Sequence, residues 1–299
     1  MDGPIPHEIG NMTSLRFLYL YENALEGFIP SEIGGLTRLA FLSLYENSLE
    51  GSIPSEIGNL VELTHLAIRS NSWTGALPAE LGNLTAIKYI SMSENDLGGS
   101  LPTELGQLTA LTQLWLRDNN FTEHIPSELG QLESLRELSL HYNNFSGSIP
   151  SEIGKLKALT SLRLYVNRLT GRIPTTLREL SGVQLFNLRH NQLTGPLPSE
   201  VGEMTALTGL YLYGNSLTGA IPSHLGRLTK LEVLRLEENL FNRTLPTQLA
   251  ELVLLEQFRI TDTFITGNLD PLFCTGDPSL PNPISIFTNN LTTCSCCQS

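Results

Sequence analysis

The chain is poor in the features on which membrane spans, disulfide-rich domains and nucleic-acid-binding proteins depend. Its 299 residues include only 4 cysteines, all beyond residue 273, so most of the chain must fold without disulfide bonds. No run of about 18 apolar residues occurs, and no segment is therefore expected to cross a bilayer. Basic residues are scarce as well: 18 Lys+Arg stand against 30 Asp+Glu. The resulting net charge of −12 argues against nucleic acid or an anionic membrane as the main partner.

The sequence patterns of common enzyme active sites are also missing. There is no glycine-rich phosphate loop after a strand, no kinase lysine or catalytic-loop pattern, and neither HExxH nor GxSxG occurs. Of the 6 histidines, only His141 and His190 are expected to share one face, without a positioned serine, cysteine or metal ligand. We therefore expect a protein that has no catalytic activity and needs no cofactor or metal.

What the sequence does have is a 24-residue period that runs through most of its length. Asparagine recurs at this spacing at Asn23, Asn47, Asn71, Asn95, Asn119, Asn143, Asn167, Asn191, Asn215 and Asn239. Proline recurs in the same way from Pro6 to Pro246. A period of this length, with leucines at fixed steps ahead of the asparagine, is typical of a solenoid whose repeats bury their apolar sides only against their neighbours.

The consensus of these repeats, LxxLxLxxNxLxGxIPxxLGxL, resembles the plant-type leucine-rich repeat over residues 3–270. That family includes the ectodomains of receptor-like kinases and receptor-like proteins, and the polygalacturonase inhibitors. The resemblance implies an α/β repeat solenoid. It would form a right-handed horseshoe with a parallel β-sheet on the concave side and short 3-10 or helical turns on the convex side.

The period divides the chain into three segments. Residues 1–14 form a partial repeat, residues 15–254 form ten 24-residue repeats, and residues 255–299 form a degenerate repeat followed by a cysteine-containing cap. The opening MDGPIPHEIGNM lacks the basic and apolar regions of a secretory signal and starts inside a repeat. We interpret it as a truncated N-terminus, with a short natural cap as the alternative.

Each repeat predicts the same local structure. The LxxLxL segment alternates apolar and variable residues, which indicates a strand with one buried face, and the amide of the following asparagine is expected to bond the backbone of the turn. Ser, Thr or Ala followed by Glu, as at Ser31 and Glu32, predicts a one-turn helix with a hydroxyl N-cap, and Gly34 suits its exit. Glycine at the turn before the Ile-Pro pair is replaced by Glu123 and Arg243, which the sequence does not explain.

Cysteines and glycosylation motifs bear on the cellular compartment. The cluster of Cys274, Cys294, Cys296 and Cys297 favours a disulfide-tied cap in an oxidising compartment, in which Cys274 pairs with one of the other three; a metal site is the alternative. Asn-x-Ser/Thr motifs occur at Asn11, Asn83, Asn120, Asn144, Asn242 and Asn290. They favour a glycosylated extracellular or cell-surface protein over a cytosolic protein with unmodified motifs.

Recognition is expected in the variable residues of the strands, because the fixed residues build the scaffold. Parallel strands stack about 4.8 Å apart, so residues 24 apart become lateral neighbours. The predicted binding surface gathers aromatic residues and arginines, which interface cores favour: Trp115, Arg117, His141, Tyr142, Arg163, Tyr165, Arg189, His190, Tyr211, Tyr213 and Arg235. The alternative is that these side chains only pack on an exposed sheet.

These observations lead to a functional hypothesis. We expect non-catalytic recognition of a protein or peptide ligand, together with a co-receptor, by the ectodomain of a receptor-like protein or receptor kinase. Receptors of that family that bind a peptide carboxylate carry an Arg-x-Arg pair on one strand, whereas the corresponding places here read Arg163-Leu-Tyr165 and Arg235-Leu-Glu237. A secreted inhibitor of cell-wall-degrading enzymes and an adhesion or surface scaffold protein are the alternatives.

Overall fold

The computed structural model describes residues 1–273, 285–288, 292–293 and 295. They belong to two compact units, residues 1–146 and 147–299. The four cysteines and Asn290, and with them the predicted disulfide cap, lie outside the described residues. None of the helices in the described part of the chain has the length and apolar character needed to cross a membrane.

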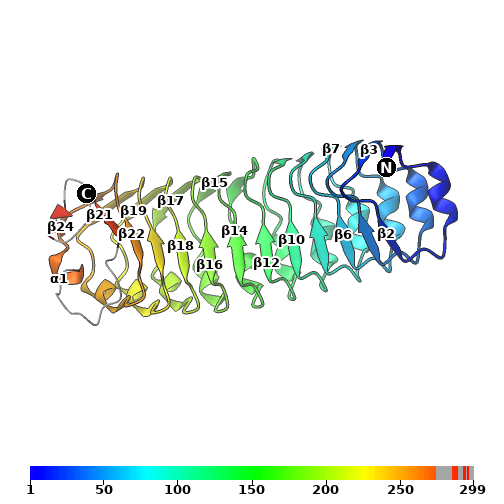
Figure 1. Ribbon diagram of the computed structural model, residues 1–299. Helices are drawn as coiled ribbons and strands as arrows, with labels where there is room; N and C mark the ends of the chain where they lie inside the picture. The colour runs from blue at the N-terminus through cyan, green and yellow to red at the C-terminus, as the bar shows by residue number, and fades with distance from the viewer. Residues whose placement is uncertain (274–284, 289–291, 294, 296–299) are drawn as a thin grey trace. The chain divides into compact units, whose positions relative to one another are not determined.

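Each unit contains a main sheet of short parallel strands, one from every coil of the solenoid (Figure 1). The first unit contributes β2 (Phe17–Tyr19), β4 (Phe41–Ser43), β6 (His65–Ala67), β8 (Tyr89–Ser91), β10 (Gln113–Trp115) and β12 (Glu137–Ser139). The second contributes β14 (Ser161–Arg163), β16 (Leu185–Asn187), β18 (Gly209–Tyr211), β20 (Val233–Arg235), β22 (Gln257–Arg259) and β25 (Ser285–Phe287). The predicted parallel sheet is therefore confirmed.

The register of the main sheet follows from the period. Phe17 pairs with Phe41 and Leu18 with Leu42, so from β2 to β22 a strand residue lies beside the residue 24 positions further along. The last pair, β22 with β25, has an offset of 28. Side chains alternate between the two faces of a strand. The middle residue of each strand therefore points into the solenoid, where Leu42 and its equivalents are buried. The first and third residues point to the opposite side, which we call the main-sheet face.

A second set of parallel strands lies directly after the asparagine position of the coils. It comprises β1 (Asp2–Pro4), β3 (Ala24–Gly27), β5 (Ser48–Gly51), β7 (Ser72–Gly75), β9 (Asp96–Gly99) and β11 (Asn120–Phe121). The later members are β13 (Ser146–Ser148), β15 (Arg168–Gly171), β17 (Gln192–Pro196), β19 (Ser216–Gly219), β21 (Leu240–Arg243) and β23 (Phe264–Ile265), while β24 (Gly267–Asn268) pairs with β26 (Thr292–Thr293). Aromatic rings take the place that leucine has in other coils at Trp73, Phe121 and Phe241 within these strands and at Phe145 directly before β13, and all four are fully buried.

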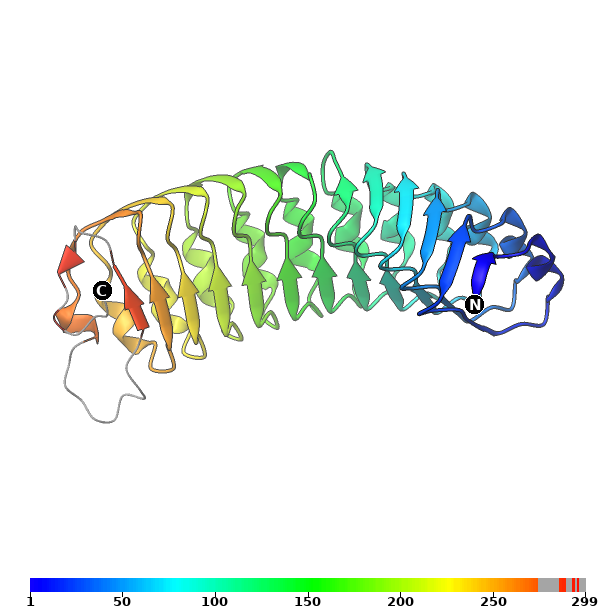
Figure 2. The same cartoon turned by 45° about the horizontal axis from the view of Figure 1, so that its top comes forward.

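Short 3-10 helices close each coil on the side away from the main-sheet face, as Figure 2 shows. In the first unit these are η1 (His7–Asn11), η2 (Ser31–Gly35), η3 (Ser55–Asn59), η4 (Ala79–Asn83), η5 (Thr103–Gln107) and η6 (Ser127–Gln131). In the second they are η7 (Ser151–Lys155), η8 (Thr175–Glu179), η9 (Ser199–Glu203), η10 (Ser223–Arg227) and η11 (Thr247–Glu251), followed by the single α-helical turn α1 (Asp270–Phe273).

The asparagine ladder has the structural role that the sequence predicts. Asn47 donates from Nδ2 to the carbonyls of Leu20 and Leu44 at 2.9 and 3.0 Å, and its Oδ1 accepts the backbone N–H of Leu25 at 3.0 Å. One side chain thus joins the backbones of two coils at the point where both turn. This satisfies polar groups that the bend would otherwise leave without partners.

The predicted helix caps are wrong. In η2 the N-cap is Pro30, with φ −67° and ψ 143°, and no side chain caps the helix. Ser31 is already the first helical residue, so its hydroxyl lies one position too late and donates to Glu32 instead. Gly34 does not end the helix either: a Cβ there would lie 2.8 Å from Cβ of Glu56, so this glycine allows neighbouring helices to approach closely.

Two turn positions are strained. Gly51 and most of its equivalents adopt positive φ, which a residue without Cβ accepts readily. Glu123 and Arg243 occupy this position in their own coils with φ of 62° and 80°. A side chain in the left-handed region costs roughly 1–2 kcal/mol. Neither side chain makes a hydrogen bond or ion pair to another residue of the described part of the chain that would offset this strain.

Candidate functional site

Tyrosine marks the main-sheet face in both units. All 8 tyrosines of the chain lie in a main-sheet strand or within three residues after one. None lies on a 3-10 helix or on the second set of strands. Tyrosine offers a large contact area and a hydrogen-bonding group at low conformational cost, so this one-sided distribution is typical of a recognition surface.

In the second unit, two predicted tyrosines and two predicted arginines form a stack across four neighbouring strands. The guanidinium carbon of Arg189 lies 4.1 Å from the ring centre of Tyr165 and 5.6 Å from that of Tyr213. On the other side of Tyr213, the guanidinium of Arg235 lies 4.0 Å from the same ring centre. Cation–π contacts of this kind hold the guanidinium groups in fixed positions. The sequence spacing of 24 places Tyr165, Arg189 and Tyr213 side by side, and Arg235 reaches over Tyr213 from the neighbouring row. We call these four residues the Tyr–Arg stack: Tyr165, Arg189, Tyr213 and Arg235.

The two arginines of the stack differ in their charge partners. Arg235 donates from Nε to Oε1 of Glu237 at 2.7 Å, and from Nη2 to the same oxygen. Glu237 is only 4% exposed, and its other oxygen, Oε2, is buried without a hydrogen-bond partner. Arg189, in contrast, has no carboxylate partner among the described residues. Its Nε is buried and has no hydrogen-bond partner either. Arg189 is therefore the cation of the stack whose charge is not compensated.

Glycines beside the stack set the positions of the neighbouring rings. A Cβ at Gly209 would lie 2.7 Å from Cε2 of Tyr211, so this ring leans over the glycine. Gly214 similarly makes room for the imidazole of His190, which meets the Tyr213 ring edge-on at 4.9 Å between centres. Burial raises the pKa of the Tyr211 phenol above its ordinary value, although Arg235 acts in the opposite direction. Tyr211 therefore remains a hydrogen-bond donor at neutral pH.

The remaining predicted residues of the second unit are placed as follows. Arg163 is the last residue of β14 and is half-buried. His190 is exposed, whereas Tyr213 is only 8% exposed and so supports the stack more than it offers surface. The prediction of an exposed Tyr213 is therefore wrong, because the arginines on both sides cover its ring.

The predicted residues of the first unit are less available to a ligand. Arg117 bonds to Glu94 and Asp118, so its charge is compensated. His141 is 5% exposed and lies 2.9 Å from the hydroxyl of Ser139 through Nδ1. Both of these side chains are buried, so the pair contributes to packing and cannot meet a substrate. Trp115 is half-buried at the end of β10, and Tyr142 is 43% exposed.

Sequence reasoning missed a row of aromatic rings in the first unit. Phe17, Phe41, His65 and Tyr89 each begin a main-sheet strand, and their rings follow one another at 5.3, 4.2 and 5.9 Å between centres. Burial lowers the pKa of His65, with Lys88 acting in the same direction. The 24-residue spacing could have revealed this row, but the prediction considered only the third strand residue and the second and third residues after the strand.

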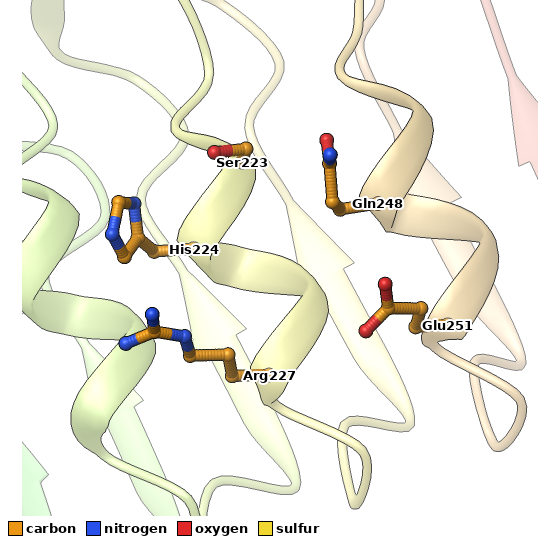
Figure 3. A pocket seen from close by; sticks show the side chains of 5 residues that line it. All are labelled: Ser223, His224, Arg227, Gln248 and Glu251. Carbon is orange, nitrogen blue, oxygen red and sulfur yellow. The ribbon is translucent and has the colours of Figure 1, made fainter.

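The side of the 3-10 helices carries a different surface. A depression of about 180 Å³ on the second unit is lined by Ser223, His224, Arg227, Gln248 and Glu251, which come from η10 and η11 (Figure 3). All five lining side chains are polar or charged. The asparagines of the described glycosylation motifs also lie away from the main-sheet strands. Asn11 and Asn83 end η1 and η4, Asn120 and Asn242 lie in β11 and β21, and Asn144 is half-buried after β12.

Comparison with known proteins identifies the family. A family model described as "Leucine-rich repeat region" matches residues 5–141 and 126–271. The chain belongs to the leucine-rich repeat family. No curated protein matches it significantly.

Solved structures similar to this leucine-rich repeat chain include plant receptors. One is the plant peptide hormone receptor RGFR1 in complex with RGF2, with 33% identity and a TM-score of 0.83 over 96% of this chain and 50% of the receptor chain. Another is the Arabidopsis receptor kinase HAESA in complex with the peptide hormone IDA and the co-receptor SERK1, with 31% identity and a TM-score of 0.90 over 97% of this chain and 48% of that one. The chain thus spans about half the length of these two receptor chains.

A bacterial protein is similar as well. The leucine-rich repeat protein LIC12759 of Leptospira interrogans shares 31% identity with a TM-score of 0.60, over 88% of this chain and 76% of the bacterial chain. The predicted parallel solenoid of leucine-rich repeats is confirmed by these structures and by the strand pairing itself.

Proposed function

We propose that this chain is a non-catalytic recognition module that binds a protein or peptide ligand on its main-sheet face. The observation that carries the proposal is the placement of all 8 tyrosines on or directly after main-sheet strands. Packing alone does not require this distribution, because leucine, isoleucine and phenylalanine fill the interior. Its best explanation is a surface selected for contact with a partner.

Within that face, the Tyr–Arg stack of the second unit is the proposed anchor. The guanidinium of Arg189 lies against the rings of Tyr165 and Tyr213, and that of Arg235 lies against the ring of Tyr213, so little side-chain freedom is lost when a ligand binds. Arg163, His190 and Tyr211 surround the stack and offer further donors. In the first unit, Trp115, Arg117 and Tyr142 are proposed to contribute contact area rather than charge, because Arg117 is already paired. The buried His141 is left out of the proposed contact surface.

The similar plant receptors support the class of partner. RGFR1 and HAESA are named as receptors in complex with peptide hormones, and HAESA also with a co-receptor. By analogy, a peptide ligand is the first candidate for this chain, with a second protein completing the complex. This role places the chain outside the cell. The described asparagines of the glycosylation motifs fit this location, because glycans there would leave the main-sheet face uncovered.

The proposal is tested with a random peptide library displayed on phage and selected on the purified chain. Enriched peptides are then synthesised, and their affinity is measured by calorimetry for the wild type and for a variant carrying Tyr165→Ala and Arg189→Ala. We expect a loss of at least about thirtyfold, equivalent to roughly 2 kcal/mol, which is the scale of an interface hot spot.

The control is Arg168→Ala, which removes an exposed arginine of β15 in the same unit. It should leave the affinity unchanged, and both variants should keep the thermal unfolding midpoint of the wild type within a few degrees. Enriched peptides that bind the double variant as tightly as the wild type would contradict the proposed surface. An equal fall in affinity and stability would mean that the stack serves packing.

A further inference from the structure

Polar groups without partners gather on the main-sheet face of the first unit. Ser91 is the last residue of β8, and Ser93 follows two positions later on the same face. Trp115 lies directly beside Ser91, on the neighbouring strand β10. Both serine hydroxyls and the indole Nε1 of Trp115 are buried and have no hydrogen-bond partner among the described residues. Buried polar groups in proteins are nearly always paired, so three unpaired groups on two adjacent coils need an explanation.

These groups are enclosed by side chains and not by a second layer of the fold. Ser91 is 0% exposed and Ser93 is 2% exposed, although the 3-10 helices lie on the opposite side of the coils (Figure 2). The indole of Trp115 reaches back over β8, where it meets the ring of Tyr89 edge-on at 5.2 Å between centres. Trp115 is itself only half-buried. A change of its rotamer therefore opens the hydroxyl of Ser91 to a ligand.

The surroundings of the three groups favour a ligand group without net charge. Glu94 and Asp118 both bond to the guanidinium of Arg117, which lies beside Ser93 in the next coil, so two carboxylates share one cation there. Their excess negative charge disfavours a carboxylate ligand. A cationic ligand would meet the indole N–H of Trp115, which can only donate a hydrogen bond.

An amide group matches the hydrogen-bonding capacity of this cluster. Its oxygen accepts a hydrogen bond, as the indole N–H of Trp115 requires, and its nitrogen donates to a hydroxyl oxygen. The hydroxyls of Ser91 and Ser93 can each accept from the amide nitrogen or donate to the amide oxygen. The aromatic rings of Tyr89 and Trp115 exclude water from such bonds, which strengthens them.

We propose that Ser91, Ser93 and Trp115 form a binding site for an amide group of the ligand, with the indole of Trp115 as its movable cover. The inference rests on the proposed function and names a ligand chemistry for the first unit. The amide belongs either to an asparagine or glutamine side chain or to the main chain of a peptide. The site is separate from the Tyr–Arg stack, which belongs to the second unit.

A purely structural role of the serines leads to a different expectation for stability. A hydroxyl that has no partner in the free protein does not stabilise the fold, so Ser91→Ala should keep the thermal unfolding midpoint of the wild type. A fall of more than a few degrees would mean that the hydroxyl is required for packing, and it would overturn the assignment of Ser91 to a ligand site.

The first binding experiment uses acetamide as the probe and needs no identified peptide. The chain has only 2 tryptophans, so ¹⁵N-labelled protein gives two indole N–H signals in NMR spectra, which Trp115→Phe assigns. We expect acetamide to shift the Trp115 signal in a saturable way, with a dissociation constant in the millimolar range because the probe is so small. The signal of the fully buried Trp73 is the internal control and should not move. Acetate and methylammonium at the same concentration should move neither signal.

Serine variants show whether this shift reports the proposed site. Ser91→Ala and Ser93→Ala should each weaken acetamide binding by about threefold to tenfold, which corresponds to the loss of one neutral hydrogen bond. The matched control is Ser43→Ala, which removes a hydroxyl at the same strand position in β4, two coils away, and should leave binding unchanged. No saturable shift of Trp115, an unchanged dissociation constant in both serine variants, or equal shifts with acetate or methylammonium would overturn the inference.

The second binding experiment uses the peptides selected on the wild type and distinguishes the two sources of the amide. Alanine in place of each asparagine or glutamine removes a side-chain amide, whereas N-methylation of single peptide bonds removes a main-chain N–H. One of these changes should weaken binding to the wild type by about tenfold. The same change should have little effect on binding to the double variant of Ser91→Ala and Ser93→Ala, because the amide has lost its partners there.

Failure of the inference and failure of the proposed function are distinguishable. Peptides that depend on Tyr165 and Arg189 but on neither serine refute the amide site and leave the recognition face intact. If no selected peptide depends on the Tyr–Arg stack, the proposed function fails, while the acetamide titration still decides whether the first unit binds an amide.

Discussion

Removal of one asparagine from the ladder should weaken the fold by an amount that follows from its partners. Asn95 is 9% exposed; its Oδ1 accepts the backbone N–H of Trp73 at 3.1 Å, and its Nδ2 donates to three carbonyls. Each of these carbonyls keeps a second donor: Asn71 for Ile68, Asn119 for Met92 and the backbone of Ser70 for Ser93. In Asn95→Ala, therefore, only the N–H of Trp73 is left buried without a partner.

The expected cost is set by that single orphaned donor. A buried polar group without a partner costs about 1–3 kcal/mol, and the weakened bonds to the carbonyls add roughly 1 kcal/mol. We therefore expect Asn95→Ala to lower the free energy of unfolding by about 2–4 kcal/mol. Urea unfolding followed by tryptophan fluorescence measures this directly, because Trp73 is fully buried at the site of the change.

A matched control separates the hydrogen bonds from the general effect of losing an asparagine. Asn23 makes equivalent bonds to the carbonyls of Leu20 and Tyr21, but its Oδ1 accepts from the exposed N-terminal amine of Met1. Asn23→Ala leaves no buried donor and should cost less than about 1 kcal/mol. A loss below about 0.5 kcal/mol for Asn95→Ala, or equal losses for both variants, would refute the role of the ladder in satisfying buried backbone groups.

Three further predictions concern strain, pH and close packing. Glu123→Gly relieves a φ of 62° and should raise the unfolding free energy by up to about 1 kcal/mol in urea titrations; a decrease would mean that the side chain makes a contact that compensates the strain. The hydrogen bond from Ser70 lowers the pKa of Glu94, with Arg117 acting in the same direction, so its stabilising contribution is present above the pKa of the unfolded state and is lost as pH falls. In Ser70→Ala the fall in melting temperature between neutral and acidic pH should therefore be smaller than in the wild type, and an unchanged pH profile would speak against this effect. Gly34→Ala should cost about 1–3 kcal/mol in the same urea assay, because the new Cβ meets the backbone oxygen of Glu56 at 2.9 Å; a neutral outcome would show that the helices can separate.

The fold could be predicted from the sequence because a solenoid repeats one local solution. The position of Asn47 in the period was enough to predict that its amide bonds the backbone of the turn, although not that it also reaches Leu20 in the preceding coil. The spacing between Phe17 and Phe41 was enough to predict the strand register. The helix caps could not be predicted as well. The pair Ser31 and Glu32 matches an N-terminal signature, but Pro30 with its fixed φ occupies the cap and shifts the helix start by one residue.

The candidate site was only partly predictable for a related reason. The period places Tyr165, Arg189 and Tyr213 in one row, which the sequence analysis used. It does not reveal how far a long side chain reaches along or across the strands. Arg235 crosses from its own row to lie over Tyr213 and bind Glu237, and Arg117 turns to Glu94. Which arginine stays uncompensated is decided by such contacts, and these depend on three-dimensional packing.

The proposed recognition face is tested most directly by hydroxyl-radical footprinting of the chain with and without a peptide selected on it. Oxidation of each tyrosine is measured by mass spectrometry, and Tyr19, which is 53% exposed in the first unit, serves as the internal reference. We predict that the peptide protects Tyr165 and Tyr211 while oxidation of residues on the 3-10 helices stays unchanged. Protection confined to the 3-10 helices or to the second set of strands, with Tyr165 and Tyr211 oxidised as in the free chain, would contradict the account.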